Sequence, residues 1–179
     1  MLEGKCKVAV FVSGGGTNLQ AILDSRGKII KNADICLVAS NNKDAYALER
    51  AKKHDIETFI IEDEQRLVEK LKSLEIDFIV LAGYLRILSE DFCKLYSNRI
   101  INVHPSLIPS FCGKGFYGLK VHEKALEYGV KVSGATVHFV NEIPDGGKII
   151  DQRSRVTKCL FPVAGLGTRF LPVTKELAK

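Results

Sequence analysis

The stretch INVHPSLIP, residues 101–109, places an asparagine and a histidine two positions apart where an apolar run meets a proline-rich loop. Side chains of a strand alternate between its faces, so we expect Asn102 and His104 to point the same way at the carboxyl edge of a sheet. The amide offers donors and an acceptor, and the imidazole titrates near neutral pH. Asp145, in NEIPDGG (141–147), adds a carboxylate ahead of two glycines that allow close approach to a ligand. Together these groups favour acyl transfer through a tetrahedral oxyanion.

The same residues also fit a purely structural interpretation. Asn102 and His104 would then hydrogen-bond to loop backbone, and Asp145 would form an ordinary Asp-Gly turn. We expect His138, on the apolar stretch TVHFV, to lie in the core or to support the site. No group of Cys, His and carboxylate residues has convincing metal-site spacing, so we predict no metal. Ser106 lies outside any GxSxG context, which argues against a serine nucleophile.

A glycine-rich segment, SGGGTNLQ (13–20), joins the first expected strand to a helix. Glycines let the backbone approach an anion, and the helix that follows offers unpaired N–H groups, so the segment is a candidate phosphate site. It lacks the Gly-Lys-Ser/Thr of a Walker loop, and Leu19 occupies the third glycine position of GxGxxG, so a dinucleotide is not implied. The alternative is a tight turn with Asn18 as the helix cap.

The rest of the chain alternates apolar runs with amphipathic stretches. The expected strands cover 7–12, 34–40, 57–61, 76–83, 99–104 and 134–140, and the expected helices cover about 18–25, 44–54, 66–74, 89–96 and 121–128. This alternation predicts an α/β fold with a doubly wound, mostly parallel sheet and helices on both faces. Ligands of such sheets bind beyond the carboxyl ends of the strands, where we expect the segments 13–17, 104–118 and 141–147.

Composition places limits on the class of protein. The chain has 179 residues, 46% of them hydrophobic and 26% charged, which is typical of a globular domain. Its net charge of +5, with no strongly basic stretch and no Trp, does not favour nucleic-acid binding. The five cysteines include no CxxC pair, and no apolar run is long enough to cross a bilayer. We therefore expect a cytoplasmic protein with reduced thiols.

Four segments in order resemble one family: VAVFVSGGGTNLQAI, LAGYLRIL, INVHPSLIPSFCGKGFYGLKVHEKALEYG and SGATVHFVNEIPDGGKII are similar to phosphoribosylglycinamide formyltransferases. The similarity runs from about residue 7 to about residue 152. It implies the formyltransferase fold and the transfer of a formyl group from 10-formyltetrahydrofolate to the amine of 5-phosphoribosyl-glycinamide in purine biosynthesis. These small molecules would be the partners, with no metal, no nucleic acid and no membrane, and the protein would be a monomer or homodimer.

The resemblance also implies roles for individual residues. The catalytic residues would be Asn102, His104 and Asp145. The residues that hold the phosphorylated substrate would be Gly15, Gly16, Thr17, Asn18 and Pro105. The residues that line the folate pocket would be Arg86, Ile87, Leu88, Asn141, Glu142 and Gly146.

Other users of 10-formyltetrahydrofolate share part of this pattern. A formyltetrahydrofolate deformylase would carry an added domain ahead of the first strand, and a methionyl-tRNA formyltransferase would carry one behind the last. We expect neither domain here, although the deformylase stays an alternative.

After about Asp151 the resemblance ends, where the family would continue with a strand and a helix that helps close the substrate site. The stretch VTKCLFPVAGLGTRFLPVTKELAK (156–179) instead resembles the N-terminus of a glucose-1-phosphate uridylyltransferase, through GLGTR (165–169) and PVTK (172–175). We therefore expect a formyltransferase domain over 1–152 and an atypical tail over 153–179, a fusion or junction segment. The alternatives are a true second nucleotide site in the tail, and a domain that binds its ligands but is catalytically impaired.

Overall fold

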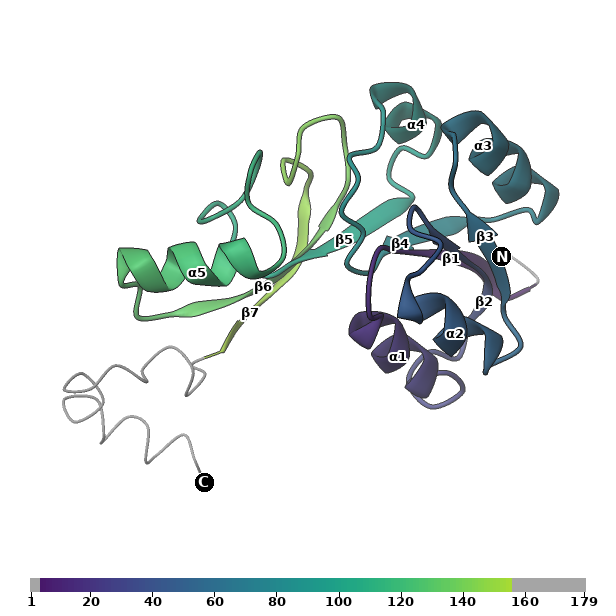
Figure 1. Cartoon of the computed structure of the whole chain (residues 1–179), viewed down its shortest axis with the longest axis horizontal. Coiled ribbons are helices and arrows are strands. Elements are labelled where there is room, and N and C mark those ends of the chain that lie inside the picture. The colour runs from purple at the N-terminus through teal and green to yellow at the C-terminus, as the bar shows by residue number, and fades with distance from the viewer. Residues whose placement is uncertain (1–3, 156–179) are drawn as a thin grey trace.

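The computed structural model describes residues 4–155, which form a seven-stranded sheet in the order β3-β2-β1-β4-β5-β6-β7 (Figure 1). The strands are β1 (Cys6–Val12), β2 (Ala33–Ser40), β3 (Glu57–Ile60), β4 (Phe78–Leu81), β5 (Ile100–His104), β6 (Ser133–Phe139) and β7 (Ile149–Arg155). The helices are α1 (Thr17–Asp24), α2 (Tyr46–Lys52), α3 (Glu64–Ser73), α4 (Glu90–Leu95) and α5 (Leu119–Tyr128).

Most of the sheet is parallel. The strands from β3 to β5 pair in parallel, whereas the β5–β6 and β6–β7 pairs are antiparallel. The chain moves outward from β1 to β2 and β3, and then returns to β4 on the other side of β1. This reversal creates a switch point between β1 and β4, where doubly wound sheets bind their ligands at the carboxyl edge. The predicted fold class is therefore confirmed.

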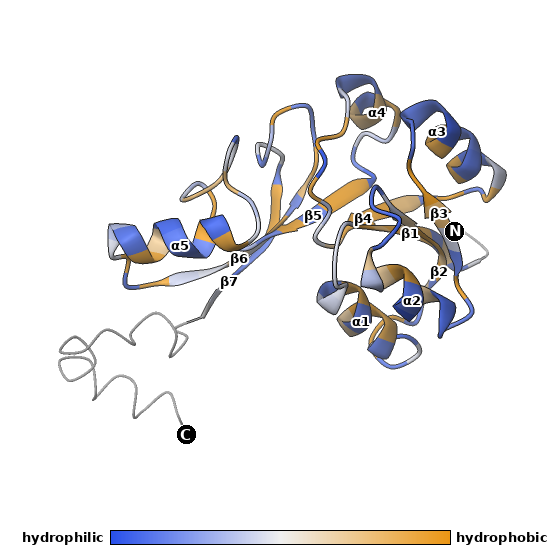
Figure 2. Ribbon diagram, viewed as in Figure 1, coloured by the Kyte–Doolittle hydropathy of each residue, from blue (hydrophilic) through white to orange (hydrophobic). Residues whose placement is uncertain are grey.

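Helices cover both faces of the parallel part of the sheet. One face packs against α1 and α2, and the other packs against α3 and α4 (Figure 1). Strand β1 lies between these layers, so Val10 and Val12 join one hydrophobic cluster while Ala9 and Phe11 join the other. Figure 2 shows the consequence, because the central strands carry the most hydrophobic residues and the helices are polar on their outer sides.

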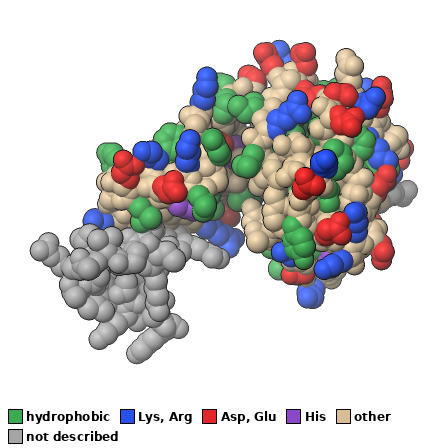
Figure 3. All heavy atoms as spheres, viewed as in Figure 1, with side chains coloured by type: hydrophobic (Ala, Val, Ile, Leu, Met, Phe, Trp, Pro, Cys, Tyr) green, Lys and Arg blue, Asp and Glu red, His purple; other side chains and the backbone are tan. Residues whose placement is uncertain are grey.

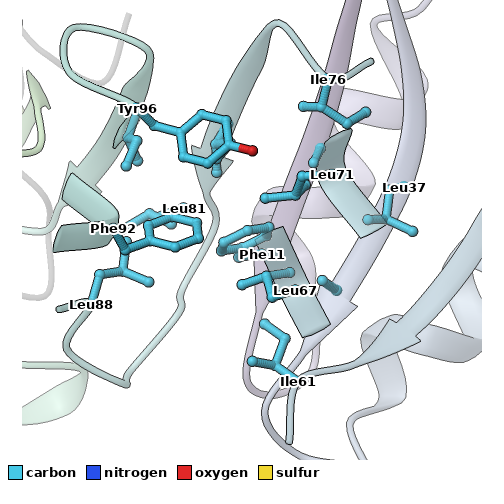
Figure 4. Packing of buried hydrophobic residues seen from close by; sticks show 14 of the residues in the cluster. Phe11, Leu37, Ile61, Leu67, Leu71, Ile76, Leu81, Leu88, Phe92 and Tyr96 are labelled. Atoms are coloured by element: carbon cyan, nitrogen blue, oxygen red, sulfur yellow. The ribbon is translucent and has the colours of Figure 1, made fainter. Parts of the chain in front are cut away.

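Aromatic side chains fill the layer between the sheet and α4 (Figure 4). The ring of Phe11 lies 5.6 Å from that of Tyr84 and 6.2 Å from that of Phe92. Phe92 in turn lies 5.1 Å from Tyr96, between ring centroids. Burial raises the pKa of the Tyr84 phenol to about 12. This packing fixes α4, and the segment before it, against the carboxyl half of the sheet.

The surface of the described residues carries both signs of charge. On the face drawn in Figure 3, lysine and arginine side chains are interspersed with aspartate and glutamate. Between residues 4 and 155, no helix is long and apolar enough to cross a membrane.

Two features differ from the sequence predictions. Strand β7 was not predicted, because its sequence IIDQRSR shows no clear hydrophobic alternation. The structure explains why this signal is missing, since the described side chains of β7 are all exposed. It pairs with β6 from Ser133 to His138 and runs past the predicted domain boundary after residue 152. Helix α1 has Gly16 at its N-cap with no side-chain cap hydrogen bond, so the alternative in which Asn18 caps the helix is wrong. The predictions for the tail, residues 156–179, lie outside the described residues.

Candidate active site

Strand β5 presents Asn102 and His104 at its carboxyl end, where the sequence places them on one face. In the antiparallel register with β6, Asn102 lies opposite His138 and His104 lies opposite Thr136. The strand ends at His104, and Pro105 begins the loop that follows. His104 is 4% exposed, so its ring is held by protein groups.

The loop between β6 and β7 brings Asp145 to both histidines. Asp145 Oδ2 lies 3.4 Å from His104 Nδ1, and its Oδ1 lies 3.5 Å from His138 Nε2. The backbone N–H of Gly113 also donates to Asp145 Oδ2, at 2.8 Å. Asp145 has a φ of +56°, an uncommon backbone conformation that the surrounding loop maintains. The convergence expected from the sequence is present, with His138 as an additional member.

The ring of His104 lies between two hydrogen-bond acceptors. Its Nδ1 faces the Asp145 carboxylate, and its Nε2 lies 2.8 Å from the carbonyl oxygen of Phe111. Both partners can only accept hydrogen bonds in these states, and only a doubly protonated imidazolium has a donor on each nitrogen. His104 therefore has an acceptor beside each ring nitrogen, next to the Asn102 amide.

His138 connects the amide to the carboxylate. Its Nδ1 donates to the carbonyl oxygen of Phe139 at 2.8 Å, because that oxygen can only accept. Its Nε2 lies 3.2 Å from Asn102 Nδ2 and 3.5 Å from Asp145 Oδ1. The exposed fraction of His138 is 1%, so its ring orientation is fixed by these contacts.

Several effects act on the Asp145 carboxyl group. Burial raises its pKa, but the contact with His138, the hydrogen bond from the Gly113 N–H and the electrostatic interaction with the two histidines outweigh burial and leave the pKa below its usual range. Asp145 is consequently ionised at neutral pH.

The loop after β5 is tied to β6 and β7. Thr136 Oγ1 donates to the carbonyl oxygen of Ser106 at 2.7 Å and accepts from the N–H of Ile108 at 3.0 Å. Gln152 Nε2 donates to the carbonyl oxygen of Ile108 at 2.8 Å and to Thr136 Oγ1 at 3.0 Å. Sequence reasoning missed Thr136 and Gln152, since their roles depend on their being opposite each other in the β6–β7 pair.

The glycine loop lies at the same edge of the sheet, between β1 and α1. Gly15, Thr17 and Asn18 are exposed, and Gly16 is half-buried against α2. A Cβ on Gly16 would lie 2.6 Å from Ala47 Cβ, so the loop and α2 are packed as closely as glycine allows. The predicted phosphate-binding residues thus stand at the positive end of α1.

The residues expected to line a folate pocket divide into three groups. Asn141 and Glu142 line a pocket between α4 and the β6–β7 loop. Arg86 and Ile87 are exposed on the segment before α4, whereas Leu88 is 8% exposed and belongs to the hydrophobic cluster under that helix. Gly146 lies in the turn of the β6–β7 loop, where its N–H donates to the carbonyl oxygen of Ile143. The other residues that line the pocket are Cys93, Lys94, Ser97, Asn98, Phe139, Val140, Gly147 and Lys148.

No group of three or more His, Cys, Asp or Glu side chains is arranged to hold a metal ion in the part of the chain that the structure describes. The titratable groups of the site instead contact one another and backbone groups.

The site thus combines an amide, a buried imidazole and a half-buried carboxylate in a doubly wound α/β fold that also carries a glycine-rich loop after β1. The formyl transferase family matches residues 6–157, and the chain belongs to this family.

Phosphoribosylglycinamide formyltransferases are among its relatives. The chloroplastic one of Arabidopsis thaliana is 40% identical over 156 aligned residues, covering 82% of this chain and 53% of the plant protein. That of Haemophilus influenzae is 41% identical over 155 residues, covering 82% of this chain and 71% of the bacterial protein. A crystal structure of the one from Anaplasma phagocytophilum superposes with a TM-score of 0.79 at 34% identity, covering 93% of this chain and 79% of that chain. The chain therefore spans about half the length of the plant relative.

Proposed function

We propose that this protein transfers a formyl group from 10-formyltetrahydrofolate to the amine of 5-phosphoribosyl-glycinamide, a step of purine biosynthesis. The observation that carries this proposal is the contact of Asp145 with His104 beside Asn102, at the edge of the sheet that also holds the glycine loop. The names of the relatives support the choice of substrates.

The reaction needs no covalent enzyme intermediate. The substrate amine attacks the formyl carbon, a C–N bond forms, and the carbonyl electron pair moves to oxygen. The charge of His104 and a donor of the Asn102 amide stabilise this oxyanion. The amide has two N–H groups, and the contact of Nδ2 with His138 leaves one of them for the substrate. The bond from carbon to N10 of the folate then breaks as the carbonyl re-forms.

Asp145 transfers the proton from the attacking amine to the leaving nitrogen. The attacking amine must lose one proton and N10 of the folate must gain one. An ionised Asp145 accepts the amine proton through water and returns it to the leaving nitrogen, while its charge keeps His104 protonated. Its lowered pKa keeps the carboxylate ready for this role at neutral pH.

The spacing of the two sites suits the proposed acceptor. The glycine loop follows β1 and His104 ends β5, and only β4 separates these strands. Adjacent strands lie about 4.8 Å apart, so the two sites are separated by roughly 10 Å across the sheet. A phosphorylated ribose that carries a short amine arm spans a similar length. Gly15, Gly16, Thr17 and Asn18 would hold the phosphate, and Pro105 would border the acceptor.

The folate would bind beside α4. Asn141 and Glu142 line the pocket there, and Arg86, Ile87 and Leu88 lead into α4. Gly146 allows the turn that carries Asp145. As further parts of the proposal, residues 1–152 form the catalytic domain, and the protein acts in the cytoplasm without a metal, as a monomer or homodimer.

The decisive test is formylation of the ribotide. The full chain, supplied with both substrates, should give a product heavier by one formyl group, measured by mass spectrometry. His104→Ala and Asn102→Ala should each lower kcat about 100-fold or more. His122→Ala, a change at an exposed histidine of α5, should leave kcat unchanged.

Three outcomes would contradict the proposal or part of it. Undiminished activity in His104→Ala and Asn102→Ala would refute their roles. Release of formate without the ribotide would identify a deformylase. Binding of both substrates without turnover, measured by calorimetry, would identify a catalytically impaired domain.

A further inference from the structure

Arg50 on α2 makes several contacts with the glycine loop and α1, although α2 contains none of the predicted site residues. Its Nε donates to the carbonyl oxygen of Gly15 at 2.8 Å, and its Nη1 donates to Gln20 Oε1 at 2.9 Å. Its guanidinium carbon also lies 5.0 Å from the ring centroid of Tyr46, one turn earlier on the helix. Arg50 is therefore fixed between the two helices that lie on the same face of the sheet (Figure 1).

Three successive carbonyl groups of the loop are engaged by neighbouring donors. The oxygen of Gly14 accepts from the N–H of Ala47 at 3.1 Å, and that of Gly15 accepts from Arg50. The oxygen of Gly16 accepts from the N–H of Gln20 at 2.9 Å, in the first turn of α1.

These contacts determine where the N–H groups of the loop point. In a trans peptide the C=O and N–H groups point in opposite directions. Because the carbonyls of Gly14, Gly15 and Gly16 are held by α2 and α1, the N–H groups of Gly15, Gly16 and Thr17 point away from those helices. Successive backbone N–H groups left free at a turn of this kind are the donors from which concave anion-binding sites are built.

We propose that Arg50 is a positioning residue for the phosphate of the acceptor. By holding the Gly15 carbonyl, it turns the Gly16 N–H toward the anion, and its guanidinium places a positive charge directly behind the loop. Its second hydrogen bond, to Gln20, holds the first turn of α1 in place beside the loop. The identity of the phosphorylated ligand rests on the proposed function, whereas the anion site and its dependence on Arg50 rest on the contacts above.

The test is equilibrium binding to the full chain, with 5-phosphoribosyl-glycinamide and inorganic phosphate as separate probes in calorimetry. Arg50→Met keeps the aliphatic stem but removes the charge and both donors. It should weaken binding of the ribotide about tenfold or more, since a charge-assisted contact to the loop is lost. KM for the ribotide should rise by a similar factor, with kcat and KM for the folate nearly unchanged. Arg50→Lys keeps the charge and should recover part of the affinity.

A matched control is Arg99→Met. Arg99 also donates to a backbone carbonyl, that of Leu95 at 2.8 Å, and also lies over a tyrosine, Tyr96 at 4.9 Å, but it contacts no part of the glycine loop. Its replacement changes net charge equally and should leave ribotide affinity unchanged. Full affinity in folded Arg50→Met, or equal loss in Arg99→Met, would overturn the inference. So would an equal rise of both KM values in Arg50→Met. If Arg50→Met does not fold, two other variants test the inference. Unaltered KM values in Arg50→Lys together with full ribotide affinity in Arg50→Gln would overturn it.

The two proposals fail separately. Binding that depends on Arg50 in a protein without formyl transfer would contradict only the proposed function. Formyl transfer with an acceptor affinity independent of Arg50 would contradict only the role of Arg50.

Discussion

Asp145 is the residue on which the other polar groups of the site depend. It contacts His104 with one oxygen and His138 with the other, and it also accepts from the Gly113 N–H. Each of these contacts stabilises the charged carboxylate, which explains why its pKa is lowered although the residue is half-buried. The Asp145 carboxylate in turn faces Nδ1 of the His104 ring.

Replacing Asp145 by asparagine keeps the shape and removes the charge. We expect Asp145→Asn to lower kcat about 100-fold or more, because the proton acceptor is lost and His104 loses its counter-charge. The folded-state pKa of Asp145 lies below its unfolded value, so its charge stabilises the fold above the unfolded pKa and this contribution disappears as pH falls through the folded pKa. Thermal unfolding should therefore show wild type more stable than Asp145→Asn at neutral pH, with the difference shrinking in acid.

Asp151→Asn on β7 is the control, because this carboxylate is exposed and contacts only Arg153 among the ion pairs of the described residues. A difference between wild type and Asp145→Asn that persists unchanged into strong acid would contradict the assigned charge state.

The individual site residues differ in how far the sequence could predict them. Asn102 and His104 follow from strand alternation, a local property that needs no knowledge of the fold. Asp145 follows from its position before two glycines. The contact of His138 with Asn102 depends on the β5–β6 register, and the contacts of Arg50 depend on the packing of α2 against a loop 35 residues earlier. Neither arrangement leaves a periodic signal in the sequence.

The antiparallel pair β6–β7 is the element that assembles the site. It carries His138 and Thr136 on one strand and Gln152 on the other, and the loop between the strands carries Asp145. The pair begins where the N–H of Phe139 donates to the carbonyl oxygen of Lys148 at 2.9 Å. The hydrophobic pattern predicted β6 but not β7, because β7 is held by its backbone ladder and by Gln152 rather than by buried apolar side chains.

A single methyl group in this element should disrupt the loop that carries Asp145. A Cβ on Gly147 would lie 1.7 Å from the carbonyl oxygen of Phe139, and a backbone oxygen cannot rotate away. We expect Gly147→Ala to lower the free energy of unfolding by about 2 kcal/mol and to abolish most activity. Chemical denaturation and the formylation assay would measure the two effects.

Gly14→Ala is the comparison for stability, since nothing lies within 4 Å of a Cβ at that position. Equal stability of Gly147→Ala and Gly14→Ala would show that the β6–β7 loop can shift without cost.

At the scale of the whole molecule, the sheet order brings distant segments to one edge. The glycine loop and the end of β5 lie at the carboxyl edge of the parallel strands. The β6–β7 loop leaves β6 opposite Ile101, near the other end of β5, and returns to bring Asp145 to His104. The alternation of strands and helices predicted this architecture because parallel strands need helical crossovers. The sequence could not predict the antiparallel edge in full, because β7 has no buried face.

Because Tyr84 is buried against Phe11, the stability of the fold should decrease at high pH, and the ultraviolet absorbance of the tyrosines can measure this. The Tyr84 phenol ionises only at about 12 in the folded chain but near 10 once exposed, so stability should fall as pH rises through this interval. Because the chain has no Trp, its near-ultraviolet spectrum is governed by five tyrosines. Burial raises the pKa of the Tyr84 and Tyr96 phenols, so these two should give phenolate absorbance only as the core opens. Tyr84→Phe should move the unfolding step to higher pH while Tyr128→Phe leaves it in place, and a single smooth titration without unfolding would contradict this expectation.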